Sequence, residues 1–155
     1  MKKNIFFALL ALFIIACGGS PESSDPNAPK PKAKSMLAEE PADDGKGIGE
    51  FKNVELNDPL NVSMIANGKS VYEIKCAACH KLTDQRVVGP GWAGVTERRK
   101  PEWIMNMITN VDVMLAEDPE AQAQLKECLV RMPNQNLSTK DARDVLEFMY
   151  ENDNK

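Results

Sequence analysis

One short run of residues, Cys76-Ala77-Ala78-Cys79-His80, constrains this chain more than any other feature of its sequence. Two thiols three positions apart at the end of a helix lie on one side of the backbone, and an imidazole follows directly. This is the spacing at which two cysteines form thioether bonds to the vinyl groups of one porphyrin while the adjacent histidine binds its iron. The motif therefore predicts that the chain folds around one covalently attached haem c, held by Cys76, Cys79 and His80.

Other uses of the two cysteines fit the sequence less well. A thioredoxin-like C-x-x-C motif needs an α/β context, and no segment of this chain alternates convincingly as a strand. Zinc would require four ligands from Cys, His or acidic side chains. A structural disulfide between Cys76 and Cys79, formed in an oxidising exterior, remains as the alternative to haem.

His80 is the only histidine, so the second axial ligand of the iron must be another kind of side chain. A methionine thioether stabilises reduced iron and raises its potential relative to a nitrogen ligand. Met132 stands in an expected loop between two helices and is followed by Pro133, and we predict it as the sixth ligand. Four other methionines recur at helical spacing, where core packing is expected: Met105, Met107, Met114 and Met149. The alternatives are an open site for small gases or peroxide, or a ligand from Lys126, Lys140 or Cys128.

The N-terminus carries the pattern of a secretory signal. Two lysines precede an uninterrupted apolar run, Ile5 to Ala16, which is shorter than the roughly 20 residues of a membrane-spanning helix. Residues 1–16 are therefore expected to be a removed signal peptide, although a retained short anchor would also fit. Ile14-Ile15-Ala16-Cys17 resembles the lipobox of bacterial lipoproteins, which implies a diacylglycerol on Cys17; an ordinary signal with an incidental cysteine is the alternative.

Residues 17–57 are rich in Pro, Ala, Ser and charge and show no sustained periodicity, so we predict a flexible linker that begins with the lipidated cysteine. Near its end, Phe51, Val54 and Leu56 are the residues expected to lie against the domain, as a short extended segment. About 40 such residues can reach on the order of 130 Å when taut. Removal of the signal takes two lysines from 19 basic residues and leaves 17 against 23 acidic residues, a net charge of −6. This balance argues against nucleic acid as a partner.

Helical periodicity dominates residues 58–155, which we assign to a single domain. Four helices are expected, at about residues 61–76, 101–115, 119–130 and from Ser138 onward. Ser138 and Asp141 resemble a capping box at the start of the last helix. Residues 80–97 carry several Gly and Pro residues and are expected to form a loop. The predicted fold class is all-α.

Three motifs resemble those of the class I cytochromes c, over about residues 58–155. Asn67-Gly68-Lys69-x-x-Tyr72 before the haem motif resembles the family's first helix, Gly89-Pro90 its turn after the haem motif, and Arg131-Met132-Pro133-Asn134 its axial-methionine loop. The resemblance implies the cytochrome c fold, with helices packed around one haem and the first and last helices crossing at Gly68. It also implies that the Pro90 carbonyl accepts the Nδ1 proton of His80 and fixes its orientation.

Two tryptophans are expected near the site. Trp103 begins an apolar stripe and should pack, whereas Trp92 is predicted as a cofactor-binding residue, either as an indole donor to a haem propionate or as a packing surface. Basic residues gather in the same segments and fit either a ring that faces an acidic partner or ordinary solvated charge: Lys75, Lys81, Arg86, Arg98, Arg99, Lys100 and Arg131.

An iron with both axial positions filled cannot bind substrate, and the chain has no second histidine for acid–base chemistry. The sequence therefore predicts a carrier of single electrons rather than an enzyme: a monomer, lipid-anchored on the periplasmic side of a bacterial membrane, with inner or outer membrane left open. Its partners would be a redox donor and acceptor, such as an oxidase or, by resemblance only, a terminal reductase such as nitrous-oxide reductase. A haem enzyme or gas sensor with an open sixth site is the alternative.

Cys128 is the one cysteine without an assigned role, and we expect it to be either a buried inert thiol or a dimer contact.

Overall fold

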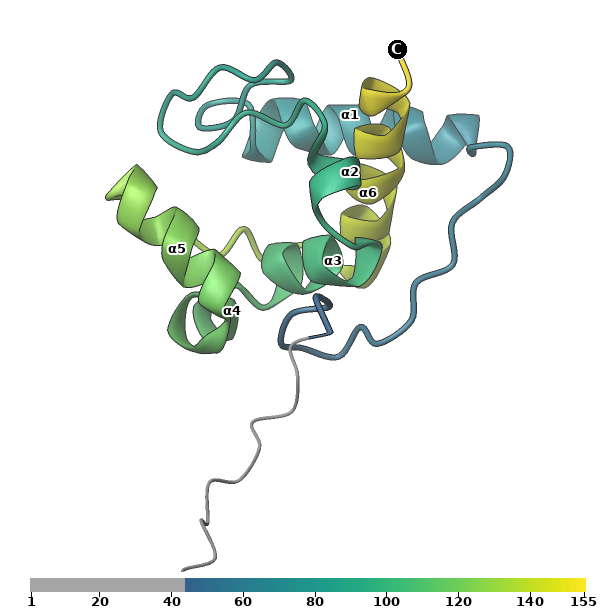
Figure 1. The fold of residues 1–155 in the computed structure, drawn as a ribbon. Coiled ribbons are helices and arrows are strands. Elements are labelled where there is room, and N and C mark those ends of the chain that lie inside the picture. Colours follow the sequence, from purple (N-terminus) through teal and green to yellow (C-terminus); the bar gives the residue numbers. More distant parts are fainter. Residues whose placement is uncertain (1–43) are drawn as a thin grey trace, which may run out of the picture. The chain divides into compact units, whose positions relative to one another are not determined.

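The structure is a computed structural model that describes residues 44–155. This part of the chain contains six helices (Figure 1). They are α1 (Val62–Lys75), α2 (Val95–Arg98), α3 (Pro101–Thr109), α4 (Val111–Glu117), α5 (Pro119–Cys128) and α6 (Thr139–Asp153). Within that range the only strand-like pairing is an isolated bridge between His80 and Arg86, so the predicted all-α class is confirmed. The expected signal peptide 1–16, Cys17 and residues 18–43 lie outside the described residues. Among residues 44–155, no helix has the length and hydropathy to cross a bilayer.

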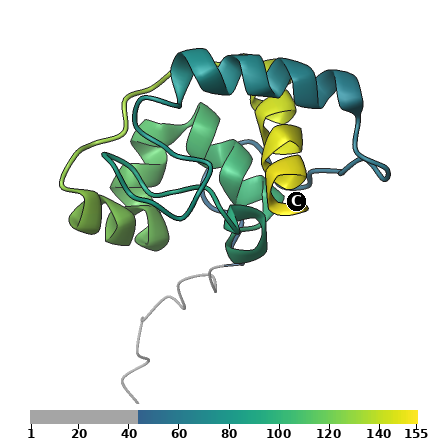
Figure 2. The ribbon, with the colours of Figure 1, turned by 90° about the horizontal axis from the view of Figure 1, so that it is seen from above.

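Helices α1 and α6 meet at Gly68, and both views show them crossing (Figure 1, Figure 2). A Cβ atom at Gly68 would collide with the backbone carbonyl of Asp144 in α6. Gly68 is therefore required by the close approach of the two helices, as the resemblance implied. One turn further along α1, the Tyr72 ring contacts Phe148 of α6 with ring centroids 5.6 Å apart, which extends the same interface.

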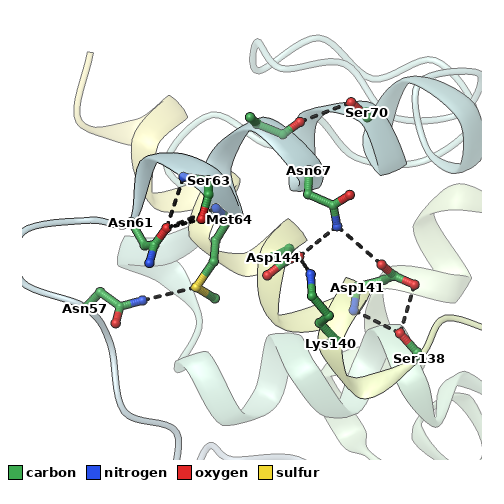
Figure 3. Close-up of polar contacts among 11 residues, drawn as sticks. Asn57, Asn61, Ser63, Met64, Asn67, Ser70, Ser138, Lys140, Asp141 and Asp144 are labelled. Atoms are coloured by element: carbon green, nitrogen blue, oxygen red, sulfur yellow. Dashed lines mark hydrogen bonds and ion pairs between the residues drawn. The ribbon is translucent and has the colours of Figure 1, made fainter.

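Polar side chains fix where α1 and α6 begin (Figure 3). Asn61 accepts hydrogen bonds from two backbone N–H groups in the first turn of α1. Ser138 accepts from the Asp141 backbone N–H at 3.1 Å and donates its hydroxyl to the Asp141 carboxylate at 2.8 Å, which confirms the expected cap. Between the two helices, the Asn67 amide donates to Asp141 and Asp144 of α6. These bonds fix the register of the crossing.

The helix expected over residues 101–115 is divided in two. The backbone leaves helical geometry at Asn110, where φ is −130° and ψ is 39°, and α4 begins at the next residue. The Asn110 side chain donates to the carbonyl of Ile48 at 3.1 Å, a residue that precedes all six helices. Apolar spacing continues across the break, which is why periodicity alone predicts one helix. The expected loop over residues 80–97 likewise contains the short helix α2.

Residues 44–57, which we call the strap, pack against the helices. The prediction of a flexible linker as far as residue 57 is therefore wrong for this segment. Phe51 and Val54 are half-buried against the core, while Leu56 remains 41% exposed. The strap is the dark blue segment that passes beneath α3 in Figure 1 and then rises to α1. The folded unit thus begins by residue 44 rather than at residue 58.

A buried carboxylate ties the end of the strap to α6. Glu147 is fully buried and accepts hydrogen bonds from Asn57 Nδ2 at 3.0 Å, the Asn61 backbone N–H at 2.7 Å and Arg143 Nη1 at 2.6 Å. Burial by itself would raise the pKa of Glu147, but the three donors outweigh burial and hold this pKa below its ordinary value. The ionised carboxylate therefore joins three segments of the chain.

We expect Glu147→Gln to lower the free energy of unfolding at pH 7 by about 2–3 kcal/mol, the scale of hydrogen bonds to a charged group. Because the folded-state pKa of Glu147 is depressed, its stabilisation is present above the unfolded pKa of about 4.3 and is lost as the pH falls through the folded value. The stability difference between wild type and variant should therefore shrink between pH 7 and pH 3, as measured by urea unfolding. The control Glu73→Gln alters an exposed residue of α1 and should change little at either pH. A difference that widened at pH 3 would contradict this role of Glu147.

Candidate functional site

A cavity of about 370 Å³ is lined by the end of α1, the loop that follows it, helices α2 to α6 and the loop between α5 and α6. The C-x-x-C-H motif contributes both of its sulfurs and its imidazole, from Cys76, Cys79 and His80. Apolar side chains make up much of the remaining wall, among them Ile104, Met107, Ile108, Leu115, Leu125, Val145 and Met149. An apolar cavity with a few convergent polar groups is typical of a cofactor site.

The two thiols of the motif lie at the C-terminal end of α1. Cys76 caps the helix, with its backbone N–H on the Tyr72 carbonyl at 2.9 Å, and the chain then makes one more turn, in which the His80 N–H donates to the Cys76 carbonyl at 2.9 Å. Both thiols are free and half-buried, and both line the cavity. Burial, together with the neighbouring Cys79, raises the pKa of Cys76 to about 11. This geometry presents two separate thiols, rather than a disulfide, to one cavity.

The imidazole of His80 is oriented by the loop that follows it. Its Nδ1 lies 2.9 Å from the carbonyl oxygen of Pro90 and donates to it, which is the contact expected from the resemblance. Gly89 lies so close that a Cβ atom there would collide with the imidazole ring. Burial lowers the pKa of His80, although the hydrogen bond to Pro90 acts in the opposite direction. His80 is therefore neutral at pH 7 and keeps the lone pair of Nε2 for a metal ion.

Trp92 packs beside His80 rather than standing apart from the site. Its ring is 7% exposed and lies 5.7 Å from His80 and 4.9 Å from Tyr72, measured between ring centroids. The Tyr72 hydroxyl donates to the His80 carbonyl at 2.9 Å, so Trp92 and Tyr72 together support the histidine. Trp103 lines the cavity as well, but its Nε1 donates to Asp118 at 3.1 Å. The indole proton of Trp103 is thus already engaged within the protein.

Three of the described methionines line the cavity. They are Met107 of α3, Met149 of α6 and Met132 of the loop between α5 and α6. Met114 is fully buried, and its sulfur accepts the backbone N–H of Ile48 at 3.0 Å. Of the other side chains considered as sixth ligand, Cys128 lines the cavity, whereas Lys126 and Lys140 do not. Met132 is half-buried and is the one cavity methionine outside a helix among residues 44–155.

Basic side chains contribute to the cavity wall from several segments of the chain. Four of the seven basic residues expected near the site line it: Lys75, Arg98, Arg99 and Arg131. The Arg99 guanidinium lies 4.8 Å from the centre of the Trp103 ring and 2.6 Å from a carboxylate oxygen of Glu120. Haem propionates are carboxylates, so cations at these positions suit them.

Sequence reasoning missed a bridge between the loop after the haem motif and α5. Arg86 Nη2 donates to the Glu127 carboxylate at 2.7 Å, and Arg86 Nη1 donates to the Glu127 backbone carbonyl at 3.1 Å. Val88 and Val130, on these same two segments, are 38% and 54% exposed and line the cavity. The two segments are 41 positions apart, and no local pattern marks their contact.

The residues of the cavity fit haem c. Two free thiols at the end of a helix suit the vinyl groups of a porphyrin, and the orientation of His80 leaves Nε2 for its iron. Apolar side chains suit the faces of the macrocycle, and the arginines suit its propionates. The same cavity contains Met132, whose thioether is a suitable iron ligand.

Comparisons with known proteins agree with this geometry. The family model for cytochrome c matches residues 65–152. A solved cytochrome c from Rhodothermus marinus is 31% identical over 71% of this chain and 94% of that protein, with a TM-score of 0.68. An engineered cytochrome c from the same organism, bound to a carbene intermediate, is 31% identical over 72% of this chain and 96% of that protein, with a TM-score of 0.65. No curated protein sequence matches the chain.

Proposed function

Because this chain belongs to the cytochrome c family and has the family's covalent haem c as its cofactor, we propose that it is a membrane-tethered carrier that passes single electrons between exported redox partners. The observation that carries the proposal is the single cavity shared by the motif's thiols, His80 and Met132. Such a site suits electron transfer better than bond chemistry, since the thiols, His80 and Met132 are all used to hold the cofactor and its iron.

Each residue of the site has a separate part in this function. When bound, haem c supplies a one-electron Fe(III)/Fe(II) couple. Cys76 and Cys79 would hold the porphyrin through thioether bonds, and His80 would bind iron through Nε2 because its Nδ1 is committed to Pro90. We assign the sixth position to Met132, whose soft thioether favours reduced iron.

The helices, rather than the C-x-x-C-H motif, keep water out of the haem cavity. Ile104, Leu115 and Val145 line the cavity and keep its interior apolar. A low-dielectric surrounding limits the reorganisation that accompanies each change of iron charge. With His80 and Met132 both on the iron, no position is left for a substrate, so the chain would act as a carrier and not as an enzyme.

Sequence patterns support the cellular setting that we propose. The signal-like residues 1–16 and the lipobox-like run that ends at Cys17 favour export followed by lipidation. The protein would then be a monomer held on the periplasmic side of a bacterial membrane. An oxidase or a terminal reductase such as nitrous-oxide reductase would be a suitable acceptor, and docking would be brief and electrostatically guided.

Redox titration and absorption spectra of the purified mature protein test the proposal. We expect a reversible one-electron transition and a low-spin, six-coordinate spectrum with the weak far-red band of methionine bound to ferric iron. Carbon monoxide should leave the spectrum of the reduced protein unchanged, because the sixth position is filled. A high-spin spectrum that shifts on addition of carbon monoxide would overturn the proposal in favour of a haem enzyme or gas sensor.

A further inference from the structure

We propose that the strap, residues 44–57, positions one wall of the haem cavity and thereby influences the coordination and the redox potential of the iron. The wall in question is formed by α3, α4 and α5, and we call it the α3–α5 wall. This inference rests on the proposed function, because it concerns the haem site itself. A continuous set of contacts runs from the strap through Trp103 to α5.

The first contact is made by a buried asparagine that forms hydrogen bonds with the backbone of the strap. Asn106 of α3 is completely buried, and its Oδ1 accepts the Phe51 N–H at 3.1 Å. Its Nδ2 donates to the carbonyl oxygens of Lys46 at 2.9 Å and Phe51 at 3.0 Å. Gly49 lies directly on this amide, where a Cβ atom would collide with Asn106 Oδ1. Asn106 therefore holds a loop of the strap against α3, and no other side chain of its size would satisfy all three bonds.

The second contact places the strap against residues of the wall. Gly47 has a φ of +69°, and a Cβ atom there would lie 2.7 Å from Met114 Cε and 3.1 Å from Trp103 Cδ1. The neighbouring Ile48 donates its N–H to the Met114 sulfur at 3.0 Å. Trp103 is 5% exposed and lines the haem cavity. The strap thus supports Trp103 directly and the cavity indirectly.

The third contact passes from Trp103 to α5. Trp103 Nε1 donates to Asp118 Oδ1 at 3.1 Å, and the same oxygen accepts the Ala121 N–H at 2.8 Å, which caps the start of α5. Asp118 is 1% exposed, so this link is shielded from water. The Asp118 carboxylate therefore links Trp103 directly to the first turn of α5.

Helix α5 depends on this link more than the other long helices do. Its main helical contact is with α4, and in Figure 1 it lies at the side of the molecule. It carries the cavity residues Leu125 and Cys128 and leads into the loop that contains Met132. A shift of Trp103 and Asp118 would therefore be passed along α5 toward the proposed iron ligand.

The variant Asn106→Leu in the full-length, haem-loaded protein tests this inference. Loss of the three buried hydrogen bonds should release the strap, and we expect α5 amides to exchange hydrogen about tenfold faster or more. Water that enters the loosened cavity favours ferric over ferrous iron, so the midpoint potential should fall and the far-red band should weaken. Asn106 would then be a positioning residue for the haem site.

The matched control is Asn67→Ala, which removes the amide that joins α1 to α6 and does not line the cavity. It should reduce stability while leaving the potential and the far-red band as in the wild type. If Asn106→Leu fails to fold, Gly49→Ala displaces the strap with α3 unchanged, and Glu50→Ala, at the exposed neighbouring position, serves as its control.

Unchanged potential, far-red band and α5 exchange in Asn106→Leu or Gly49→Ala would overturn the inference and leave the strap with a purely stabilising role. That outcome differs from failure of the proposed function, in which the wild-type protein itself would lack the far-red band. The two hypotheses are therefore separated by the wild-type spectrum before any variant is compared.

Discussion

Replacing Cys76 and Cys79 together by alanine will yield a protein without covalently bound pigment. The two sulfurs line one cavity at the end of α1, and no other described cysteine lies in the haem motif. His80 alone would leave the cofactor held by a single coordinate bond and by packing. Haem staining of the denatured protein, and extraction with acid acetone, should show complete loss of attachment in the double variant and weakened attachment in each single variant.

The size of the cavity indicates that the double variant will also lose its folded stability. A void of 370 Å³ left by the missing cofactor would cost up to about 9 kcal/mol, at roughly 24 cal/mol per Å³ for a closed cavity. That amount is comparable with the whole stability of a small domain, about 5–15 kcal/mol. Thermal unfolding followed by circular dichroism should therefore lose its cooperative transition.

Cys128→Ala is the control for this prediction, because Cys128 also lines the cavity but lies outside the motif. Its pigment should survive denaturation and acid acetone. A double variant that kept covalent haem, or a Cys128→Ala protein that lost it, would refute the assignment of Cys76 and Cys79.

The second large effect is expected from Met132→Ala. Removal of the thioether should abolish the far-red band, lower the midpoint potential, and let the reduced protein bind carbon monoxide at the vacated position. The change in potential should exceed that of Asn106→Leu, because a ligand is lost rather than displaced. Spectra of ferric and ferrous protein and a redox titration provide the measurements.

Two matched variants distinguish Met132 from the other methionines of the cavity. Met107→Leu and Met149→Leu preserve apolar volume within α3 and α6 and should retain the far-red band. Loss of the band in either of them, with its retention in Met132→Ala, would transfer the role of sixth ligand to a helix.

The haem motif and its immediate surroundings could be predicted from sequence because their chemistry depends on local spacing. The positions of Cys76, Cys79 and His80 follow from one turn of backbone after α1, whereas the crossing of α1 and α6 at Gly68 was expected from the resemblance to class I cytochromes c. Pro90 reaches His80 from only ten positions further along the chain. The haem motif and Pro90 are close together in the sequence, whereas the Gly68 crossing joins two helices far apart in the sequence and needed the resemblance to be predicted.

The strap could not be predicted in the same way. Its composition lacks the apolar periodicity that identifies packed segments, because it is held largely by backbone hydrogen bonds to Asn106 and Asn110. Asparagine occurs within helices and at their ends, so neither Asn106 in α3 nor Asn110 at the break before α4 gives a sign in the sequence that it binds another segment. Gly47 and Gly49 were the available signal, since each sits where a side chain would collide with α3 or α4.

The strap also limits how far the haem could travel from the lipid that we propose on Cys17. Since the described fold begins at Asp44, at most 26 residues separate that cysteine from it. Even fully stretched, they span no more than about 90 Å, compared with about 130 Å for a linker that continued to residue 57. The volume that the domain could reach, a half-sphere on the outer side of the membrane, is then about a third of the volume that the longer linker would allow. An electron acceptor would therefore have to expose its entry point closer to the bilayer than the sequence alone suggests.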